Sequence, residues 1–477
     1  MFKFIIKAYK FIILAIFIFF ILVILFLPVS IKSLVSNAKI TYIELVNKIR
    51  VYEYFIKNKD IVEVRKSFEK NKNINIEHYK IDEDIISGSH VLKLKIFDTE
   101  FLNVNYDNLP GTNMPYFEVI NNNNLLLHYG VGNFAIFNHK NNKLKKINTN
   151  YCNILEKHTF NICLEEYKVA TDAYEFGVRD IFLDEDLKLY ISSYISANED
   201  HSCTGLAIFV SEPLDIKNII INFKLLYKTP TCVENPNAAS SGGRIQRLNT
   251  EHIIITIGDF QTSHTDIDKT QENYYKKNHV SQNYNSHFGK TIIIDNEGNS
   301  EIYTLGHRNP HGLYKYKNFI IETEHGPNGG DEVNLLIKEK NYGYPYASYG
   351  FAYTEDIQML KTHGNIYEEP ILYFSPSIGI SEIIVYDKPE LHRWKNKTLI
   401  TSLAENSLFI ADIDYEKRHV RSIDKIFLGN INIKNKDGSL NFRIRDIKID
   451  DKGKIWLLTG DNFIGYLEKS KNDYKGF

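Results

Sequence analysis

The sequence is poor in proline, sulfur and tryptophan. Its 477 residues include 12 prolines, 4 cysteines, 3 methionines and 2 tryptophans. The scarcity of proline argues against a proline-rich disordered chain, while 31 tyrosines and 29 phenylalanines favour β-strands. No cysteines have the close spacing of a zinc or thiol-redox motif, which argues against a zinc site.

The chain also lacks an excess of charge of either sign. Lysine and arginine number 57, and aspartate and glutamate number 59, so the formal net charge is −2. This balance predicts no nucleic-acid partner and no bulk electrostatic binding to membranes. The length allows one large all-β domain, or two smaller domains, with additional segments.

Charged residues are absent from residues 11–31, which include the unbroken apolar run Phe11–Leu27. These twenty-one residues would span roughly 31 Å as a helix, enough to cross a bilayer core. We expect an uncleaved single-pass anchor, because the run is longer than a signal-peptide core and Leu27-Pro28-Val29-Ser30 is a poor cleavage site. A cleaved signal peptide is the alternative. Lysines in residues 1–10 place that end in the cytoplasm, so the remainder faces the periplasm or cell exterior.

The four cysteines fit an exported domain. An even count outside the cytoplasm suggests two disulfides, and three pairings are possible. We prefer the sequential pairs Cys152–Cys163 and Cys203–Cys232, the second of which brackets a predicted hairpin. Four unrelated buried thiols are the alternative.

Residues 32–90 read as a stalk or linker that is partly helical. From about Ile40 to Lys70 the segment is charged and has no glycine, and Ile43, Val46 and Ile49 fall near helical spacing. A helical stalk, or a helix packed against the main domain, would fit this pattern. A flexible tether is the alternative.

Residues 91–477 have a sequence pattern that predicts β-strands, and this pattern recurs as a repeated unit. Each unit is an apolar strand, a polar turn and a second apolar strand, and successive units begin about 58 to 72 residues apart. Six such units predict an all-β, six-bladed propeller of four-stranded blades. The units begin at Phe117, Val178, Arg244, Gly312, Glu382 and Asp446.

Two glycine-rich segments carry the densest chemistry, Gly306–Leu313 and Glu324–Asn334. Glycine and proline at this density mark turns at strand ends, where backbone carbonyls can face a ligand. Asp331 and Glu332 add hard oxygen ligands of the kind that calcium prefers, and Arg308 offers a planar guanidinium for a carboxylate or a quinone oxygen. The alternative is a pair of hairpin loops with solvated charges.

These segments, followed by Asn341–Pro345, resemble the signature of the soluble PQQ-dependent sugar dehydrogenases, the glucose/sorbosone dehydrogenase family. The family pattern reads GHRNPQG, a Glu-x-Gly-Pro-x-x-x-Asp-Glu loop, and NYGWP. Here His311 replaces the glutamine and Tyr344 the tryptophan. The resemblance covers about residues 100–470 and implies a six-bladed propeller that binds pyrroloquinoline quinone (PQQ) and Ca²⁺.

The resemblance also implies roles for particular residues. The arginine of the Arg-Asn pair polarises the reactive carbonyl of the quinone, and arginines of a C-terminal Arg-x-Arg-Asp motif pair with PQQ carboxylates. Backbone carbonyls of the Gly-Pro pair hold the calcium that bridges to PQQ, and the Asp-Glu pair matches a second, structural calcium site. The matching positions are Arg308 and Asn309, Arg443 and Arg445, Gly326 and Pro327, and Asp331 and Glu332.

Two positions depart from the family pattern. The general base of the family is the histidine of a His-x-Gly-Gly-Arg motif, and Ser240 stands there in Ser240–Arg244. A serine without a partner cannot take a proton from a sugar hydroxyl at neutral pH. The second departure is Ala404, where the family has a lysine that contacts the quinone.

Other histidines are possible substitutes for the missing base. His311 lies in the signature, and His264, His279 and His287 follow Gly258-Asp259. The alternative is that each is a solvated loop histidine. No Gly-x-Ser-x-Gly elbow is present, which argues against a hydrolase.

Two functions therefore follow from the sequence. The first is a membrane-anchored, calcium- and PQQ-dependent dehydrogenase that oxidises an aldose-like sugar or alcohol and passes electrons to a membrane quinone or a cytochrome. The second is a non-catalytic propeller that keeps the calcium scaffold and binds a sugar or a protein. Retention of Arg308 and Asn309 favours the first, and Ser240 and Ala404 favour the second.

Overall fold

The computed structural model describes the chain between residues 73 and 473 with gaps. The predicted N-terminal segment (1–10), anchor (11–31) and the stalk up to residue 72 lie outside the described residues. Among the described residues, no helix is long and apolar enough to cross a membrane. The described ranges are 73–79, 81, 84–87, 89–97, 99, 116–129, 132–159, 177–198, 203–215, 220–234, 240–260, 279–351, 362–429, 442–460 and 463–473.

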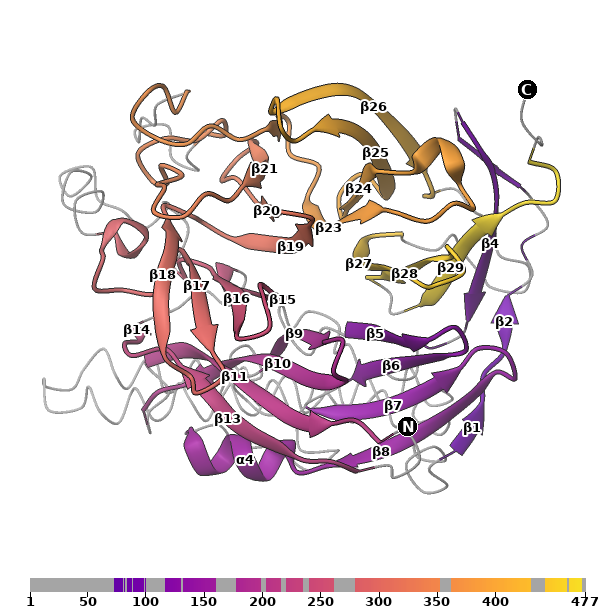
Figure 1. Cartoon of the computed structure of the whole chain (residues 1–477), viewed down its shortest axis with the longest axis horizontal. Helices are drawn as coiled ribbons and strands as arrows, with labels where there is room; N and C mark the ends of the chain where they lie inside the picture. The colour runs from indigo at the N-terminus through magenta and orange to yellow at the C-terminus, as the bar shows by residue number, and fades with distance from the viewer. Residues whose placement is uncertain are drawn as a thin grey trace, which may run out of the picture. The chain divides into compact units, whose positions relative to one another are not determined.

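Six sheets, antiparallel except where β12 pairs with β8, form the blades of a β-propeller, which confirms the predicted fold class (Figure 1). Blade 1 contains β5 (Tyr116–Asn121), β6 (Asn124–Tyr129), β7 (Asn133–Asn138) and β8 (Lys143–Thr149), with β1 (Asn73–Asn75) and β12 (Ile220–Ile221) beside β8. Blade 2 contains β9 (Val178–Leu183), β10 (Lys188–Ser196), β11 (Cys203–Pro213) and β13 (Phe223–Lys228), with β14 (Val233–Glu234) beside β11. Blade 3 contains β15 (Gly242–Arg247), β16 (His252–Ile257), β17 (Lys290–Asp295) and β18 (Ser300–Leu305).

The other three blades follow the same plan. Blade 4 contains β19 (Pro310–Tyr316), β20 (Phe319–Glu324), β21 (Asp331–Leu335) and β22 (Leu372–Phe374). Blade 5 contains β23 (Ile380–Tyr386), β24 (Lys397–Ser402), β25 (Ser407–Asp414) and β26 (His419–Phe427). Blade 6 contains β27 (Ile444–Ile449), β28 (Ile455–Thr459), β29 (Ile464–Lys469) and β4 (Val91–Phe97), with β2 (His78–Tyr79) and β3 (Ile85–Ile86) beside β4.

The first strand of each blade lies innermost. Figure 1 shows β5, β9, β15, β19, β23 and β27 around the centre, and each of these strands contacts the next until β27 meets β5. The six predicted strand pairs are the first two strands of each blade. The inner strands therefore line a central channel, and residues far apart in sequence meet there.

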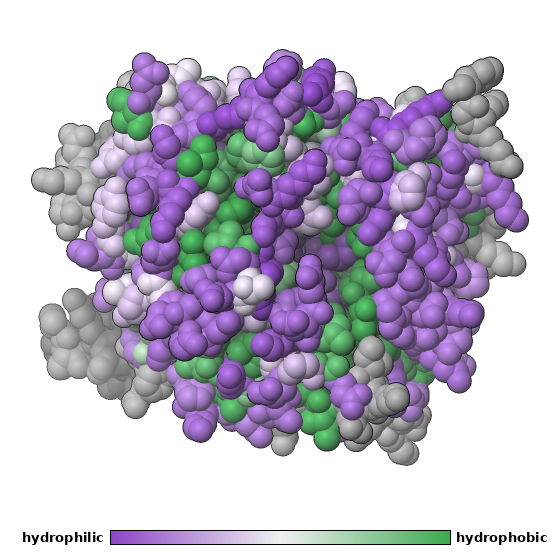
Figure 2. Space-filling model, viewed as in Figure 1, coloured by the Kyte–Doolittle hydropathy of each residue, from purple (hydrophilic) through white to green (hydrophobic). Residues whose placement is uncertain are grey.

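Apolar side chains are buried between neighbouring blades. Middle strands such as β16 (HIIITI) are covered on both faces, and β26 at the outer edge of blade 5 is mostly exposed. Buried clusters join adjacent blades, as where Ile384 and Leu399 of blade 5 pack with Ile447 and Leu457 of blade 6. Hydrophilic residues cover most of the visible face in Figure 2. This arrangement explains why the sequence shows evenly spaced apolar runs.

The ring is closed by pairing the start of the domain with its end. β4 pairs with β29, from Leu92 opposite Lys469 to Phe97 opposite Ile464. His90 Nδ1 lies 3.0 Å from an oxygen of Asp473 beside this junction. Residues 73–86, predicted as part of the stalk, instead carry β1, β2 and β3, because short extended segments can add to exposed sheet edges. The propeller thus begins before residue 91.

The described residues contain one α-helix, α4 (Tyr151–His158), and two single-turn 3-10 helices, Val280–Gln282 and His392–Trp394. Tyr151 and Leu155 of α4 pack against blades 1 and 2. The predicted disulfide Cys203–Cys232 is confirmed, with the Cα atoms 5.5 Å apart. Cys152 is also disulfide-bonded, and its predicted partner Cys163 lies outside the described residues.

Candidate functional site

Five of the six inner strands contain a β-bulge near their N-terminal end. The pairing register shifts at or just after the second residue of β9, β15, β19, β23 and β27. Such β-bulges re-aim side chains and occur often beside active sites. We call this end of the central channel the channel mouth. The second residues of these strands are Arg179, Gly243, His311, Ser381 and Arg445.

Beneath the channel mouth, the third residues of five of the six inner strands form a buried ionic ring, and the third residue of β19 is Gly312. The ring contains Glu118, Asp180, Arg244, Glu382 and Asp446, together with Lys448. Arg244 NH1 lies 2.9 Å from carboxylate oxygens of Asp180 and Glu382 and 3.8 Å from Asp446, and Lys448 Nζ lies 2.8 Å from Glu118. Burial raises the pKa of Glu118 and of Glu382 to about 7. This ring forms a charged floor below the channel mouth.

The segments of the sequence signature meet at the channel mouth. The backbone N–H of Arg308 donates to Glu324 at 2.7 Å, and the N–H of His325 donates to the carbonyl of Asn309 at 3.1 Å. Gly306 has a positive φ of 82°, and a Cβ there would lie 2.2 Å from Asn341, so this close approach requires glycine. The signature therefore encodes one compact structure made from three loops.

Arg308 is oriented across the Gly-Pro turn. Its NH1 donates to the carbonyls of His325 and Gly326 at 3.1 and 3.0 Å. A small cavity beside it is lined by Arg308, Gly326, Pro327 and Tyr344, among others. A carbonyl oxygen has two lone pairs, so the Gly326 carbonyl can still accept a cation beside Arg308.

Asp331 organises this turn. One of its oxygens accepts from Gly326 N at 3.2 Å and Ser377 Oγ at 2.7 Å, and the other accepts from Ile380 N at 2.9 Å. Three protein donors therefore engage the carboxylate that the sequence proposed as a calcium ligand. In this arrangement Asp331 holds the loop between blades 4 and 5. A carboxylate has about four acceptor positions, so its role as a calcium ligand stays a prediction.

Two neutral histidines lie at the centre of the channel mouth. The rings of His311 and His325 are 4.3 Å apart. Burial lowers the pKa of both, and neighbouring positive charges lower it further, although Asp331 opposes this fall for His325. For His325 these charges are Arg308 and Arg443, and for His311 they include Arg179, Arg244 and Arg445.

The predicted cofactor residues are therefore brought together. Arg308 donates to the His325 carbonyl, and the Asn309 carbonyl accepts from His325 N. The charges of Arg443 and Arg445 lower the pKa of His325 and of His311, respectively. This is a chemically suitable donor set for an anion with several carboxylates, because guanidinium groups bind carboxylates through paired hydrogen bonds. The residues present thus fit PQQ.

Ser240 lies buried next to Arg308. Its hydroxyl donates to Asp259 Oδ1 at 2.5 Å, and the Asp259 N–H donates to the Arg308 carbonyl at 2.8 Å. The serine proton is therefore directed at a carboxylate, away from a base role. An imidazole in this place would instead have Asp259 as its orienting partner.

The alternative histidines differ in position. His279 is buried, its Nδ1 accepts from Ser281 N, and its Nε2 lies 3.6 Å from Asp259. His287 bonds to the hydroxyl of Tyr227 at 2.6 Å. His264 lies outside the described residues. Of the three that are described, only His311 is at the channel mouth.

Ala404 lies in the loop after β24. Its N–H donates to the carbonyl of Ile378 at 3.0 Å, and Gly379 packs against it with a positive φ of 62°. The position thus adjoins the loop that Asp331 holds. An alanine supplies no cation there, so the family's quinone-contacting lysine has no replacement at this position.

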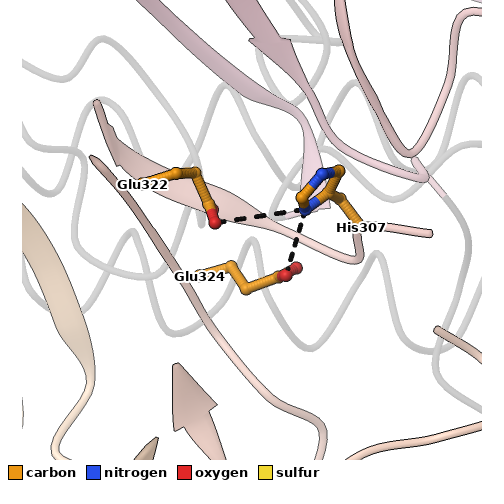
Figure 3. A group of neighbouring side chains, drawn as sticks. All are labelled: His307, Glu322 and Glu324. Atoms are coloured by element: carbon orange, nitrogen blue, oxygen red, sulfur yellow. Dashed lines mark hydrogen bonds and ion pairs between the residues drawn. The ribbon is translucent and has the colours of Figure 1, made fainter. Parts of the chain in front are cut away.

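A buried acidic cluster lies behind Arg308 (Figure 3). In Figure 3 the side chains of Glu322 and Glu324, both on β20, point toward His307. His307 Nδ1 lies 3.2 Å from Glu324 and 4.0 Å from Glu322. The amide of Asn334 donates to Glu322 at 3.0 Å and Glu324 at 3.1 Å, and lies 3.5 Å from Glu332.

This acidic cluster has too few donors for its carboxylates. Glu322, Glu324 and Glu332 are all buried, and Glu322 Oε1 has no hydrogen-bond partner. Burial, and then the neighbouring Glu324, raises the pKa of Glu322 and Glu332 well above the usual value. Three buried carboxylates, one of them with an oxygen that has no donor, fit a divalent cation.

Several of these residues were not singled out in the sequence. Glu322 and Glu324 alternate along a strand and so share one face, but the sequence alone does not show that this face is buried. Arg179 has a visible signal, since Val178-Arg179-Asp180-Ile181 resembles Ile444-Arg445-Asp446-Ile447. His325 lies inside the recognised loop, yet its stacking on His311 depends on the fold.

Comparisons with known proteins give a consistent result. A family model described as Glucose / Sorbosone dehydrogenase matches residues 119–466. The aldose sugar dehydrogenase YliI of Escherichia coli (strain K12) is 24% identical over 295 residues, which cover 60% of this chain and 75% of that protein. The solved apo-form of the soluble aldose sugar dehydrogenase (Asd) from Escherichia coli has a TM-score of 0.56 at 18% identity, covering 80% of this chain and 100% of that chain.

A second solved structure is the PQQ-bound form of the aldose sugar dehydrogenase (Adh) from Streptomyces coelicolor. It has a TM-score of 0.51 at 16% identity and covers 83% of this chain and 99% of that chain. At such identities the two solved structures support the propeller fold alone.

Proposed function

The chain belongs to the glucose/sorbosone dehydrogenase family, as its sequence motifs predicted, and we propose that it is an oxidoreductase that uses PQQ to oxidise an aldose-like sugar or alcohol. The observation that carries the proposal is the fixed guanidinium of Arg308, which donates to the carbonyls of His325 and Gly326 beside the His311–His325 ring pair. The relative named as the aldose sugar dehydrogenase YliI supports the same substrate class.

PQQ supplies a quinone that accepts a hydride when it is bound. The residues proposed to hold it are Arg308, Asn309, Arg443 and Arg445. Arg308 is already fixed by the carbonyls of His325 and Gly326, so its positive charge is positioned before a ligand arrives. Such pre-oriented charge stabilises negative charge that develops on a bound group.

We propose two calcium sites. The first uses the carbonyls of Gly326 and Pro327 beside Arg308, as the family motif implies. The second uses Glu332 together with Glu324 and Glu322, three buried carboxylates of which Glu322 has an oxygen without a hydrogen-bond partner. Asp331 would support the first site through its bond to Gly326 N.

Removal of the cation should destabilise the chain, and one substitution should separate binding from folding. A chelator is expected to lower the melting temperature by several degrees, since about 1 kcal/mol corresponds to 2–4 °C for large domains, and calcium should restore it. Glu322→Gln should bind calcium at least about tenfold more weakly, because one ionic ligand is lost. Its melting temperature in chelator should exceed that of the unmodified chain, because glutamine avoids the cost of burying a carboxyl group whose pKa is raised by burial and by Glu324.

Glu301→Gln is a matched control, since Glu301 is exposed and pairs with Lys338. It should change neither value. An unmodified chain that melts at one temperature with and without chelator would remove both calcium sites from the proposal.

A second candidate function is a non-catalytic propeller that binds a sugar or a protein. The bond from Ser240 to Asp259 favours it, because a hydroxyl that donates to a carboxylate is not a general base. In this alternative the channel mouth still binds ligands, but hydride transfer is absent.

Reconstitution separates the two candidates. The full-length chain in detergent would be loaded with PQQ and Ca²⁺ and assayed for dye reduction with several aldoses and alcohols. A PQQ absorbance spectrum with slow turnover is expected for the oxidoreductase. A PQQ spectrum without any turnover would favour the binding protein, and the absence of bound PQQ would overturn the cofactor assignment.

We also propose that residues 11–31 anchor the chain, with the propeller in the periplasm or outside the cell. The support is the uncharged twenty-one-residue run and the lysines that precede it. Cell fractionation tests this placement, and recovery of the full-length chain in the soluble fraction would exclude an anchor.

A further inference from the structure

Arg179 differs from the other buried arginines of the inner strands. It is 5% exposed, and its Nε and NH2 have no hydrogen-bond partner. No carboxylate in the described part of the chain forms an ion pair with it. In contrast, Arg244 pairs with carboxylates of the ionic ring, and Arg247 pairs with Asp184.

An aromatic ring gives Arg179 only partial compensation. Its guanidinium lies over the ring of Tyr194 at 5.2 Å, and Tyr194 stacks on Phe260. A cation–π contact contributes about 0.5–2 kcal/mol, whereas an unpaired buried charge costs several kcal/mol. Arginine cannot relieve that cost by losing its proton. The guanidinium therefore lacks a counter-ion within the described part of the chain.

The position of Arg179 shows where an anion would bind. Val178-Arg179-Asp180-Ile181 in β9 corresponds to Ile444-Arg445-Asp446-Ile447 in β27, and the register shift of each strand falls at its arginine. Arg179 is thus the counterpart in blade 2 of Arg445 in blade 6. The positive charges of both arginines lower the pKa of His311 at the channel mouth.

Gly243 makes room for this arrangement. It has a positive φ of 113°, and a Cβ there would lie 2.3 Å from the Cβ of Arg179. The neighbouring bulge in β15 therefore packs directly on the stem of Arg179 and fixes the direction of the guanidinium.

We propose that Arg179 is an anion-binding residue of the channel mouth and receives a carboxylate of a bound small molecule. The proposal rests on the proposed function, which it refines. The carboxylate has two possible sources, a sugar acid as substrate or PQQ itself. The guanidinium group of Arg179 could bind the carboxylate of a sugar acid or of PQQ through the same pair of hydrogen bonds.

The test compares the full-length chain with Arg179→Met by thermal unfolding and calorimetric titration. Separate titrations use D-glucuronate, D-glucose as the neutral sugar, and PQQ with Ca²⁺. Without ligand, Arg179→Met should melt at the same temperature or higher, because it removes an unpaired buried charge. It should bind D-glucuronate or PQQ on the order of tenfold more weakly, or worse, as expected for a lost charge-assisted hydrogen bond.

Arg247→Met is the matched control, since Arg247 lies over Tyr190 at 5.1 Å but is paired with Asp184. It should melt at a lower temperature and bind all three ligands as the unmodified chain does. A loss confined to D-glucuronate would identify a sugar acid, and a loss confined to PQQ would identify the cofactor. Unchanged affinity for both, with a lower melting temperature, would overturn the proposal. The PQQ spectrum and turnover of the unmodified chain test the proposed function separately.

Discussion

Ser240→His should raise the rate of sugar-dependent dye reduction by the PQQ- and calcium-loaded chain on the order of 10²-fold or more, as expected for an added general base. Ser240 already lies 2.5 Å from Asp259, next to the backbone of Arg308. A histidine there would have one ring nitrogen held by Asp259 and the other free for the substrate hydroxyl. The measurement is kcat/KM for an aldose, with and without the substitution.

The pH dependence identifies the base. Only the neutral imidazole accepts a proton, so kcat/KM of Ser240→His should rise as the pH increases through the histidine pKa, ordinarily about 6.5. The neighbouring Asp259 favours the charged imidazolium and so raises the pKa of the new histidine. The rise in kcat/KM should therefore occur at a higher pH. When Asp259→Asn is combined with Ser240→His, kcat/KM should fall again, and its rise with pH should return to the ordinary histidine pKa.

Ser240→Ala is the matched control for an inert serine. It should leave the slow rate of the unmodified chain within about threefold, since no proton transfer is lost. If Ser240→Ala instead abolished turnover, the serine and Asp259 would be part of the native machinery, and the assignment of a missing base would be wrong.

The propeller was predictable because its signal is repeated. Each blade begins with two apolar strands separated by a polar turn, and covering both faces of the middle strands makes these runs continuous. The compact loops of the signature were also predictable, because its glycines allow close contacts between loops, as between Gly306 and Asn341. Local sequence carries both kinds of information.

The chemistry of the channel mouth was harder to predict from the sequence. It depends on the pairing register of the strands and on partners that are distant in sequence. A bulge adds one residue to a strand and changes which side chain faces the channel, yet it leaves the apolar pattern almost unaltered. The donors to Asp331 come from Ser377 in the loop after blade 4 and from Ile380 at the start of blade 5, as well as from Gly326, and the sequence does not show these contacts. Residues 73–86 were assigned to a stalk, since strands of two or three residues have too little periodicity to recognise.

Arg244→Met should be the most destabilising single substitution in the channel, by about 3–5 kcal/mol, because it leaves buried carboxylates without their cation. Arg244 NH1 lies 2.9 Å from both Asp180 and Glu382. Its other nitrogens donate to the carbonyls of His311 and Arg445, so the loss should also loosen the channel mouth. The free energy of unfolding, from denaturant titration, measures the effect.

The pH dependence of this loss has a definite sign. Burial already raises the pKa of Glu382 to about 7, and Arg244 opposes that rise. Without Arg244 the folded chain holds protons that the unfolded chain releases near the usual glutamate pKa, so stability falls as the pH rises. Arg244→Met should therefore lose more stability at pH 8 than at pH 5.

Arg421→Met provides the exposed control, since Arg421 also contacts two carboxylates, those of Asp412 and Asp414, but is half exposed. It should cost no more than about 1 kcal/mol at either pH, because solvent screens surface pairs. Equal losses for Arg244→Met and Arg421→Met would show that the ionic ring is solvated in solution. The channel mouth would then rest on a water-filled channel, and the raised pKa of Glu382 would have no physical basis.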